Sequence, residues 1–212
     1  PYLIDGKSIK IHQQWADYFQ KHYLIVRSWA SWEWLRYMQR YNPNVPAIAN
    51  KLFAPRERAS LADQKKYCRV ITENAPVHCV FSRERIAERA PPLDHYLPWS
   101  FVAHDHLWNL IPTLQHVNFS KSNNFPDSSY HQDFIALQHL GLTTSYQHMP
   151  EHTWRKYTEP YMLDLKVSNK DDLLSLEVIT NAYQPVLESL SALAKGQGFA
   201  SNWIYKCLSR NT

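Results

Sequence analysis

The stretch that decides the fold is residues 93–126, LDHYLPWSFVAHDHLWNLIPTLQHVNFSKSNNFP. In it, Asp94 and His95 stand at the end of a short apolar run, where we expect a β-strand to end. Asn109 opens a second apolar run 15 residues after Asp94, and Asn118 follows 24 residues after Asp94 in a segment of helical character. The spacing therefore predicts two short strands followed by a helix, with polar side chains at the end of each element.

This layout resembles that of the HNH nucleases, whose ββα-metal motif holds one divalent cation between two strands and a helix. Its spacing is most similar to that of the HNH domain of the RNA-guided CRISPR nucleases, which also carries Asn in the third position. Lys121, Ser122 and Pro126 match that domain as well. The resemblance covers about a sixth of the chain. It implies a Mg²⁺-dependent endonuclease that cuts DNA by a one-metal mechanism.

The side chains in these positions suit phosphodiester hydrolysis. The imidazole of His95 has an ordinary pKa of about 6.5, so it can take a proton from water near neutral pH. Neighbours on a strand point to opposite faces, which leaves Asp94 to bind Mg²⁺ or Mn²⁺ through a carboxylate oxygen. We expect Asn118 to add a carbonyl oxygen to the metal and Asn109 to orient the His95 loop by hydrogen bonds. The candidate catalytic residues are thus His95 and Asn109, and the candidate metal ligands are Asp94 and Asn118.

Three basic residues are candidates for contact with nucleic acid. Lys121 lies three residues after Asn118 on the same helical face and could reach a phosphate group. Arg83 and Arg85 lie at or beside the tip of a predicted hairpin. Ordinary solvated surface charges are the alternative for all three. Residues 1–90 hold 15 Lys and Arg against 8 Asp and Glu, whereas residues 91–212 hold 8 against 11. A basic half beside an acidic metal site would suit a polyanion such as double-stranded DNA.

The cysteines do not form a zinc-binding pattern. Cys68, Cys79 and Cys207 are widely spaced, and the chain has no Cys-x-x-Cys pair. In HNH proteins such a pair often lies on the hairpin before the Asp-His strand, but here Cys79 is followed three residues later by Ser82. We therefore expect no structural zinc, a small buried side chain at Cys79, and reduced thiols in a cytoplasmic protein.

The run His104-Asp105-His106 lies in the connection between the two predicted strands. In an extended segment the two histidines share a face and could bind a transition metal. Exposed imidazoles, or imidazoles close to DNA, are the reading that we favour from sequence.

Helices are predicted on both sides of this centre. Residues 2–10 indicate a short extended piece with a turn at Asp5-Gly6. The spacing of apolar residues predicts helices over 12–41, 47–53, 60–73, 129–140, 151–165 and 171–196. The first is one helix or two joined near Ser28–Ser31, Ser60 is expected to cap the third, and Pro185 is expected to kink or restart the last. The stripe over 12–41 is rich in aromatic rings. We expect these rings to pack in a core, with stacking on nucleic-acid bases as the alternative.

The predicted fold is α+β and mostly helical, with a ββα-metal core at 76–127 between helical regions at 1–75 and 128–212. A content of 44% apolar residues is enough for a core, and no run approaches the ~20 apolar residues of a membrane span. The start at Pro1 suggests a piece of a longer protein. We expect an HNH endonuclease, acting alone, as a homodimer or with a partner protein, in bacterial defence. The alternatives are an RNase or structure-specific nickase with the same centre, and an inactive nucleic-acid-binding or scaffold protein.

Overall fold

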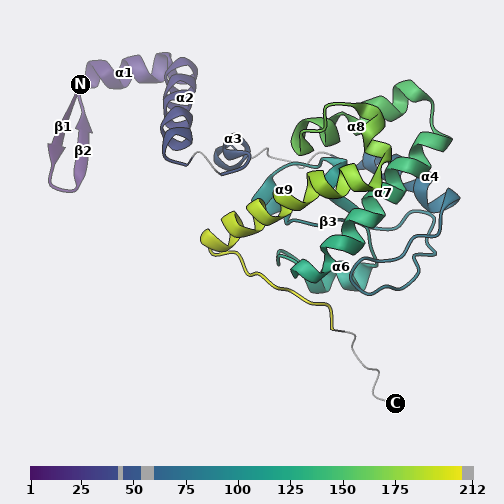
Figure 1. The fold of residues 1–212 in the computed structure, drawn as a ribbon. Coiled ribbons are helices and arrows are strands. Elements are labelled where there is room, and N and C mark those ends of the chain that lie inside the picture. The colour runs from purple at the N-terminus through teal and green to yellow at the C-terminus, as the bar shows by residue number, and fades with distance from the viewer. Residues whose placement is uncertain (43–44, 54–59, 207–212) are drawn as a thin grey trace. The chain divides into compact units, whose positions relative to one another are not determined.

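The computed structural model describes residues 1–42, 45–53 and 60–206, and the chain divides into two compact units, Pro1–Ala54 and Pro55–Thr212. Helices dominate both units over the described residues, and each unit has one two-stranded antiparallel sheet (Figure 1). This composition is consistent with the predicted mostly helical α+β class. The metal-binding character of the core and the functional boundaries at residues 76 and 128 stay predictions. Over the described ranges, we find no helix with the length and hydropathy of a membrane span.

The first unit begins with the predicted hairpin. β1 (Tyr2–Asp5) pairs antiparallel with β2 (Ser8–Ile11), and Asp5 lies opposite Ser8. Gly6 turns the chain at a φ of 60°, a left-handed value that a residue without a Cβ adopts at no steric cost.

Three helices follow in this unit: α1 (Gln13–Lys21), α2 (Tyr23–Tyr41) and α3 (Ile48–Leu52). The joint between α1 and α2 lies at His22, whose φ of −110° and ψ of 24° leave the helical region. The predicted joint near Ser28–Ser31 is therefore wrong, because the serines there are accommodated within α2. The end of α2 at Tyr41, ahead of an Asn-Pro sequence, is as predicted.

The aromatic stripe of α1 and α2 is exposed within its own unit. Neither helix has a buried residue, and Trp29, Trp32 and Tyr41 are each about 60% exposed. Some rings contact each other, as Trp34 and Tyr37 do with stacked planes. The expectation that these rings pack in a core is thus not met by the described residues of the first unit.

The second unit begins with α4 (Ala62–Asn74), which buries Tyr67, Cys68 and Ile71. Its first residue is Ala62, and Leu61 precedes it without a side-chain cap. The prediction that Ser60 caps this helix is therefore wrong.

A reduced hairpin follows α4. In the predicted hairpin around Arg83, the bridged pair that the structure describes is His78 and Arg85. Arg83 turns the chain at a left-handed φ of 60°. Main-chain hydrogen bonds of 2.9 Å join Cys79 to Glu84 and Ile86 to Val77. The connection is thus a tight turn with little strand on either side.

The predicted strand-strand-helix arrangement lies at the centre of this unit. β3 (Leu93–His95) pairs antiparallel with β4 (Leu110–Pro112), so that Asp94 lies opposite Ile111. Between the strands are α5 (Trp99–Val102) and the 3-10 turn η1 (Leu107–Asn109), and α6 (Gln115–Lys121) follows β4. As predicted, Asp94 and His95 end the first strand, Asn109 precedes the second, and Asn118 is helical.

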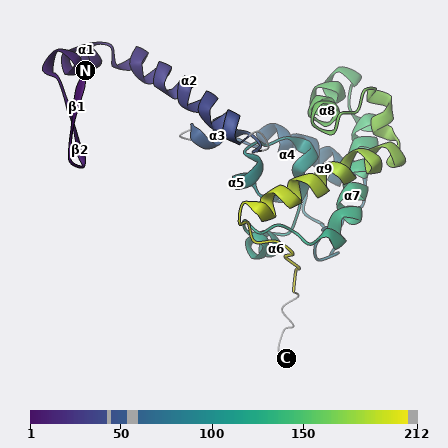
Figure 2. The same ribbon diagram turned by 60° about the vertical axis from the view of Figure 1, so that its left-hand side comes forward.

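The remaining elements cover this centre: η2 (Ser128–Tyr130), α7 (His131–His148), α8 (Glu151–Leu165), η3 (Lys170–Leu174) and α9 (Leu176–Gly196). Helices α7 and α9 lie side by side in both views (Figures 1 and 2). α8 has the predicted bounds. α9 continues through Pro185, where a kink or restart was predicted, because its apolar face is held by the buried Tyr183 and Leu187.

Gly141 does not end a helix, although the sequence predicts an end near residue 140. α7 passes through it and continues to His148. A Cβ at Gly141 would lie 3.1 Å from Cδ1 of Ile71 and 3.6 Å from the hydroxyl of Tyr67, both on α4. The missing side chain therefore allows α4 and α7 to approach closely.

Phe134 of α7 connects the centre to the helices around it. Its ring, which is 0% exposed, stacks on Tyr96 at 3.8 Å between centroids and meets Tyr183 of α9 edge-on at 5.4 Å. Tyr96 directly follows β3. The aromatic cluster thus fixes the strand that carries Asp94 and His95 against α7 and α9.

We predict that Phe134→Ala lowers the free energy of unfolding of the second unit by about 3–5 kcal/mol, because it leaves a cavity among buried rings. Phe119→Ala is the matched control, since Phe119 on α6 is 75% exposed and its removal should cost less than about 0.5 kcal/mol. Urea denaturation followed by circular dichroism measures both. Equal losses for the two variants would contradict this packing.

Candidate active site

Asp94 of β3 and Lys121 of α6 form a buried ion pair. Nζ of Lys121 lies 3.0 Å from Oδ2 of Asp94, and the two side chains are 0% and 9% exposed. The ammonium donates a hydrogen bond of 2.7 Å to the main-chain oxygen of His95, whereas its direction toward Asp94 does not give a hydrogen bond. Oδ2 of Asp94 is thus a buried carboxylate oxygen whose counter-charge is the ammonium of Lys121.

The alternative of a solvated surface charge is wrong for Lys121. Lys121 lies four residues after Val117, which is also 0% exposed, so this face of α6 points inward. Its predicted contact with a phosphate group stays a prediction, but the structure has its ammonium at the centre rather than in solvent.

Burial shifts the pKa values of these two groups in opposite directions. Desolvation raises the pKa of the Asp94 carboxyl, and the charge of Lys121 counteracts that rise. Desolvation likewise lowers the pKa of the Lys121 ammonium, and Asp94 counteracts that fall. Each charge therefore partly offsets the effect of desolvation on the other.

His95 is held by an acidic residue that the sequence did not assign to it. Its Nε2 lies 2.8 Å from Oδ1 of Asp105, and its side chain is 12% exposed. Because a carboxylate can only accept, Nε2 carries the proton and the lone pair lies on Nδ1. Burial lowers the pKa of His95, and its hydrogen bond to Asp105 partly offsets this effect. The imidazole is therefore neutral at neutral pH, as a general base must be.

Asn109 holds the chain just after His95. Its Oδ1 accepts a hydrogen bond of 2.8 Å from the N–H of Leu97, and its Nδ2 donates one of 2.9 Å to the oxygen of Leu97. The main-chain oxygen of Asn109 also accepts from the N–H of Tyr96 at 2.8 Å. The side chain is fully buried. These contacts fit the predicted orienting role, which itself stays a prediction.

The other predicted residues are Asn118, Arg83 and Arg85. Asn118 is half-buried on α6, three residues before Lys121 and so on the same helical face. Arg83 is exposed and pairs with Asp133 of α7 at 3.2 Å, and Arg85 is exposed in the bridged hairpin. Metal binding by Asn118 and nucleic-acid binding by the two arginines stay predictions.

The two cysteines that the structure describes are buried. Sγ of Cys79 lies 3.5 Å from the hydroxyl of Thr113, and Cys79 is 1% exposed. Burial raises the pKa of the Cys68 thiol to about 12. Cys79 thus has the buried position that we predicted, while Cys207 lies outside the described residues.

A second polar cluster lies beside this centre. His104 and His106 meet Asp164 of α8, which lies 58 residues after His106, and their candidate ligand atoms all lie within 4.8 Å of one another. Sequence reasoning missed Asp164, because no spacing rule connects it to the histidines. It also missed the role of Asp105, although this residue stands between them in the sequence.

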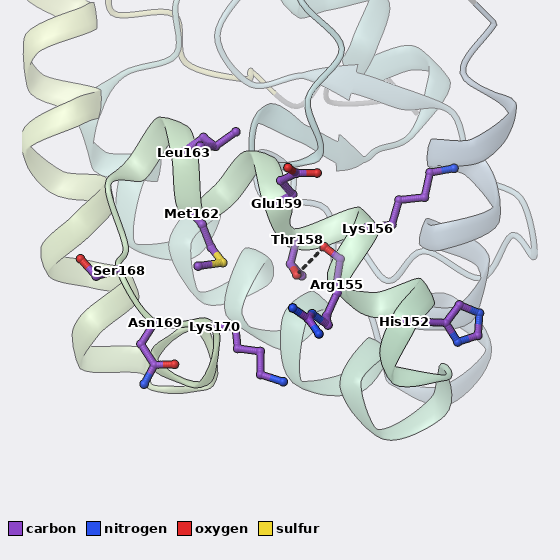
Figure 3. Close-up of a pocket in the computed structure, with 10 residues that line it drawn as sticks. All are labelled: His152, Arg155, Lys156, Thr158, Glu159, Met162, Leu163, Ser168, Asn169 and Lys170. Carbon is purple, nitrogen blue, oxygen red and sulfur yellow. Dashed lines mark hydrogen bonds between the residues drawn. The ribbon is translucent and has the colours of Figure 1, made fainter.

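The candidate centre does not lie in the hollow on α8. A hollow of about 760 Å³ follows that helix, with the basic side chains of Arg155, Lys156 and Lys170 around it (Figure 3). No predicted site residue lines it. The hollow is therefore separate from the predicted site residues.

Comparison with known proteins identifies this part of the chain. Residues 79–127 match the family model of the HNH endonucleases, a segment that begins in the hairpin and includes β3, β4 and α6. The match confirms the resemblance seen in the sequence. No curated protein and no solved structure matches the chain.

We predict that Lys121→Met lowers the free energy of unfolding by about 3–5 kcal/mol, because it leaves the carboxylate of Asp94 buried without a counter-charge. The double variant Asp94→Asn/Lys121→Met should recover a large part of that loss, because neither charge remains. Chemical denaturation of the wild type, both single variants and the double variant forms a double-mutant cycle. Additive losses would mean that the two charges do not interact.

Proposed function

We propose that this protein is a Mg²⁺- or Mn²⁺-dependent HNH endonuclease that hydrolyses phosphodiester bonds in DNA. One observation carries the proposal. Asp94 and His95 end β3 within the matched segment 79–127, and α6 presents its inward face to the same carboxylate. A hard-cation ligand and a neutral imidazole thus stand next to each other at one end of a small sheet.

The residues present fit a divalent cation at Asp94. Its Oδ2 is buried and receives no hydrogen bond from the described residues, so a carboxylate lone pair is available there. We infer that Asp94 and Asn118 hold the cation, which would act as a Lewis acid on the phosphoryl group and neutralise the leaving oxygen. Lys121 supplies the compensating charge at Asp94 in the structure.

In this proposal His95 takes the proton from the attacking water. The lone pair on Nδ1 serves as the base, while Asp105 holds the proton of Nε2 and stabilises the charged imidazolium that forms. Asn109 is a positioning residue, because its two hydrogen bonds with Leu97 fix the main chain that follows His95. Each role belongs to a side chain whose neighbours restrict its rotation.

We further propose that regions on both sides of the centre bind the substrate. The excess of Lys and Arg over residues 1–90, together with exposed Arg83 and Arg85, supports contact with the backbone of double-stranded DNA. One HNH centre cuts one strand, so a double-strand break would need a homodimer or two successive nicks. Defence of a bacterium against foreign DNA is the biological role that we propose by analogy with nucleases of this type.

We predict that the purified chain relaxes supercoiled plasmid with Mg²⁺ and leaves it intact with EDTA. His95→Ala should slow cleavage by about 10²- to 10⁴-fold, the usual contribution of a general base. His116→Ala is the matched control, because His116 is an exposed histidine on α6 and its removal should leave the rate unchanged. Gel electrophoresis of nicked and linear products measures each rate.

The same assay separates the alternatives. Cleavage of RNA in preference to DNA would support an RNase with this centre, and nicking restricted to branched DNA would support a structure-specific enzyme. Binding of DNA with the same affinity by wild type and His95→Ala, with no cleavage by either, would support a nucleic-acid-binding protein without nuclease activity. Cleavage that is unchanged in His95→Ala would contradict the proposed mechanism.

A further inference from the structure

His104, His106 and Asp164 come together from two distant parts of the second unit. The histidines lie in the segment between α5 and η1, and Asp164 lies in the last turn of α8. Nδ1 of His106 is 2.6 Å from Oδ2 of Asp164, and the rings of His104 and His106 stack at 4.3 Å between centroids. The predicted site uses none of these three side chains.

We propose that His104, His106 and Asp164 bind a divalent transition-metal cation of the Zn²⁺ type. Two imidazoles and one carboxylate form a donor set that borderline metals prefer, whereas Mg²⁺ prefers oxygen ligands alone. Three protein ligands leave a coordination position for water, as in open zinc sites. The site is therefore chemically distinct from the oxygen donors of Asp94 and Asn118.

The geometry of the cluster suits this occupant. Ligand atoms in a tetrahedral zinc site are about 3.4 Å apart, given bonds of about 2.0–2.1 Å, and the three candidate atoms already lie within 4.8 Å of one another. His104 and His106 are two residues apart in an extended segment, so both rings lie on one side of the chain. Small side-chain rotations are enough to converge the three groups on one ion.

Neighbouring groups orient the candidate ligands by hydrogen bonds, as they commonly do in metal sites. The indole N–H of Trp108 donates to Oδ2 of Asp164 and orients the carboxylate. The main-chain N–H of His106 donates to Nδ1 of His104 at 3.3 Å, a long contact that a metal ion can displace. His106 is 43% exposed and Asp164 32%, so an ion can enter from solvent.

The charges in the cluster also favour a cation. Asp164 stands at the C-terminal end of α8, where the helix dipole is negative and a positive charge is stabilising. Burial would raise the pKa of its carboxyl, but hydrogen bonds from His106 and Trp108 hold that pKa below the usual value. Burial also lowers the pKa of His104 to about 4, so its imidazole is neutral and able to coordinate at neutral pH.

A cation here would fix the segment that positions His95. Asp105 stands between the two histidines, and its carboxylate is the partner of His95. An ion shared with Asp164 would join this segment to α8. This consequence rests on the proposed nuclease function, whereas metal binding itself does not and is tested separately.

The test uses the full chain after treatment with EDTA and removal of the chelator. Zn²⁺ is titrated by calorimetry and Co²⁺ by its visible absorption spectrum, both in excess Mg²⁺ to occupy oxygen sites. We expect one Zn²⁺ per chain and a rise in melting temperature on binding. We expect a weaker Zn²⁺ affinity for Asp164→Asn, which keeps the acceptor for Trp108, and for His104→Gln. Each loss should exceed the roughly 10–100-fold loss that is typical when a hydrogen-bond partner of a metal ligand is removed.

Two controls locate the ion. His95→Ala removes the imidazole next to Asp94, and His152→Ala removes an exposed histidine of α8; both should bind Zn²⁺ as wild type does. Unchanged binding by Asp164→Asn and His104→Gln, loss of binding in His95→Ala alone, or no uptake by the wild type would each overturn the proposal. Melting curves without metal identify a variant that fails to fold. If one of Asp164→Asn and His104→Gln does not fold, Zn²⁺ binding by the other tests the proposal.

Discussion

The second unit depends on burying one pair of opposite charges, Asp94 and Lys121. An unpaired ion in this interior would cost several kcal/mol, so β3 and α6 must remain where the two groups meet at 3.0 Å. The same ammonium also binds the main-chain oxygen of His95. One electrostatic constraint therefore fixes the strand end, the helix and the candidate base with respect to each other.

A sheet of three residue pairs cannot hold a candidate centre in place by itself. The surrounding helices provide further hydrogen bonds to it. Gln138 of α7 donates a hydrogen bond of 2.9 Å to the main-chain oxygen of Leu110. The hydroxyl of Tyr183 of α9 donates one of 2.8 Å to the main-chain oxygen of Trp108. These buried polar contacts satisfy main-chain oxygens of η1 and of β4. The helices thus support the chain at the start of β4 and just before it.

The positions of the predicted site residues could be read from the sequence because they depend on residue type and local spacing. Asp94, His95 and Asn109 belong to short elements whose order follows from apolar runs. Asp105 was harder to assign, because its contact with His95 depends on how the chain folds back through α5 and η1. Asp164 could not be found at all, since its approach to His106 is set by the packing of α8.

The sequence by itself determined the strand-strand-helix order of residues 93–121, the family resemblance and most of the helices, because these follow from local periodicity and turn residues. Tertiary structure alone decided which side chains are inside. It buried Lys121 against Asp94, continued α7 through Gly141 so that α4 could approach, and brought Asp164 to the two histidines. Burial and contacts between distant residues depend on how whole elements pack, and no local spacing in a sequence contains that information.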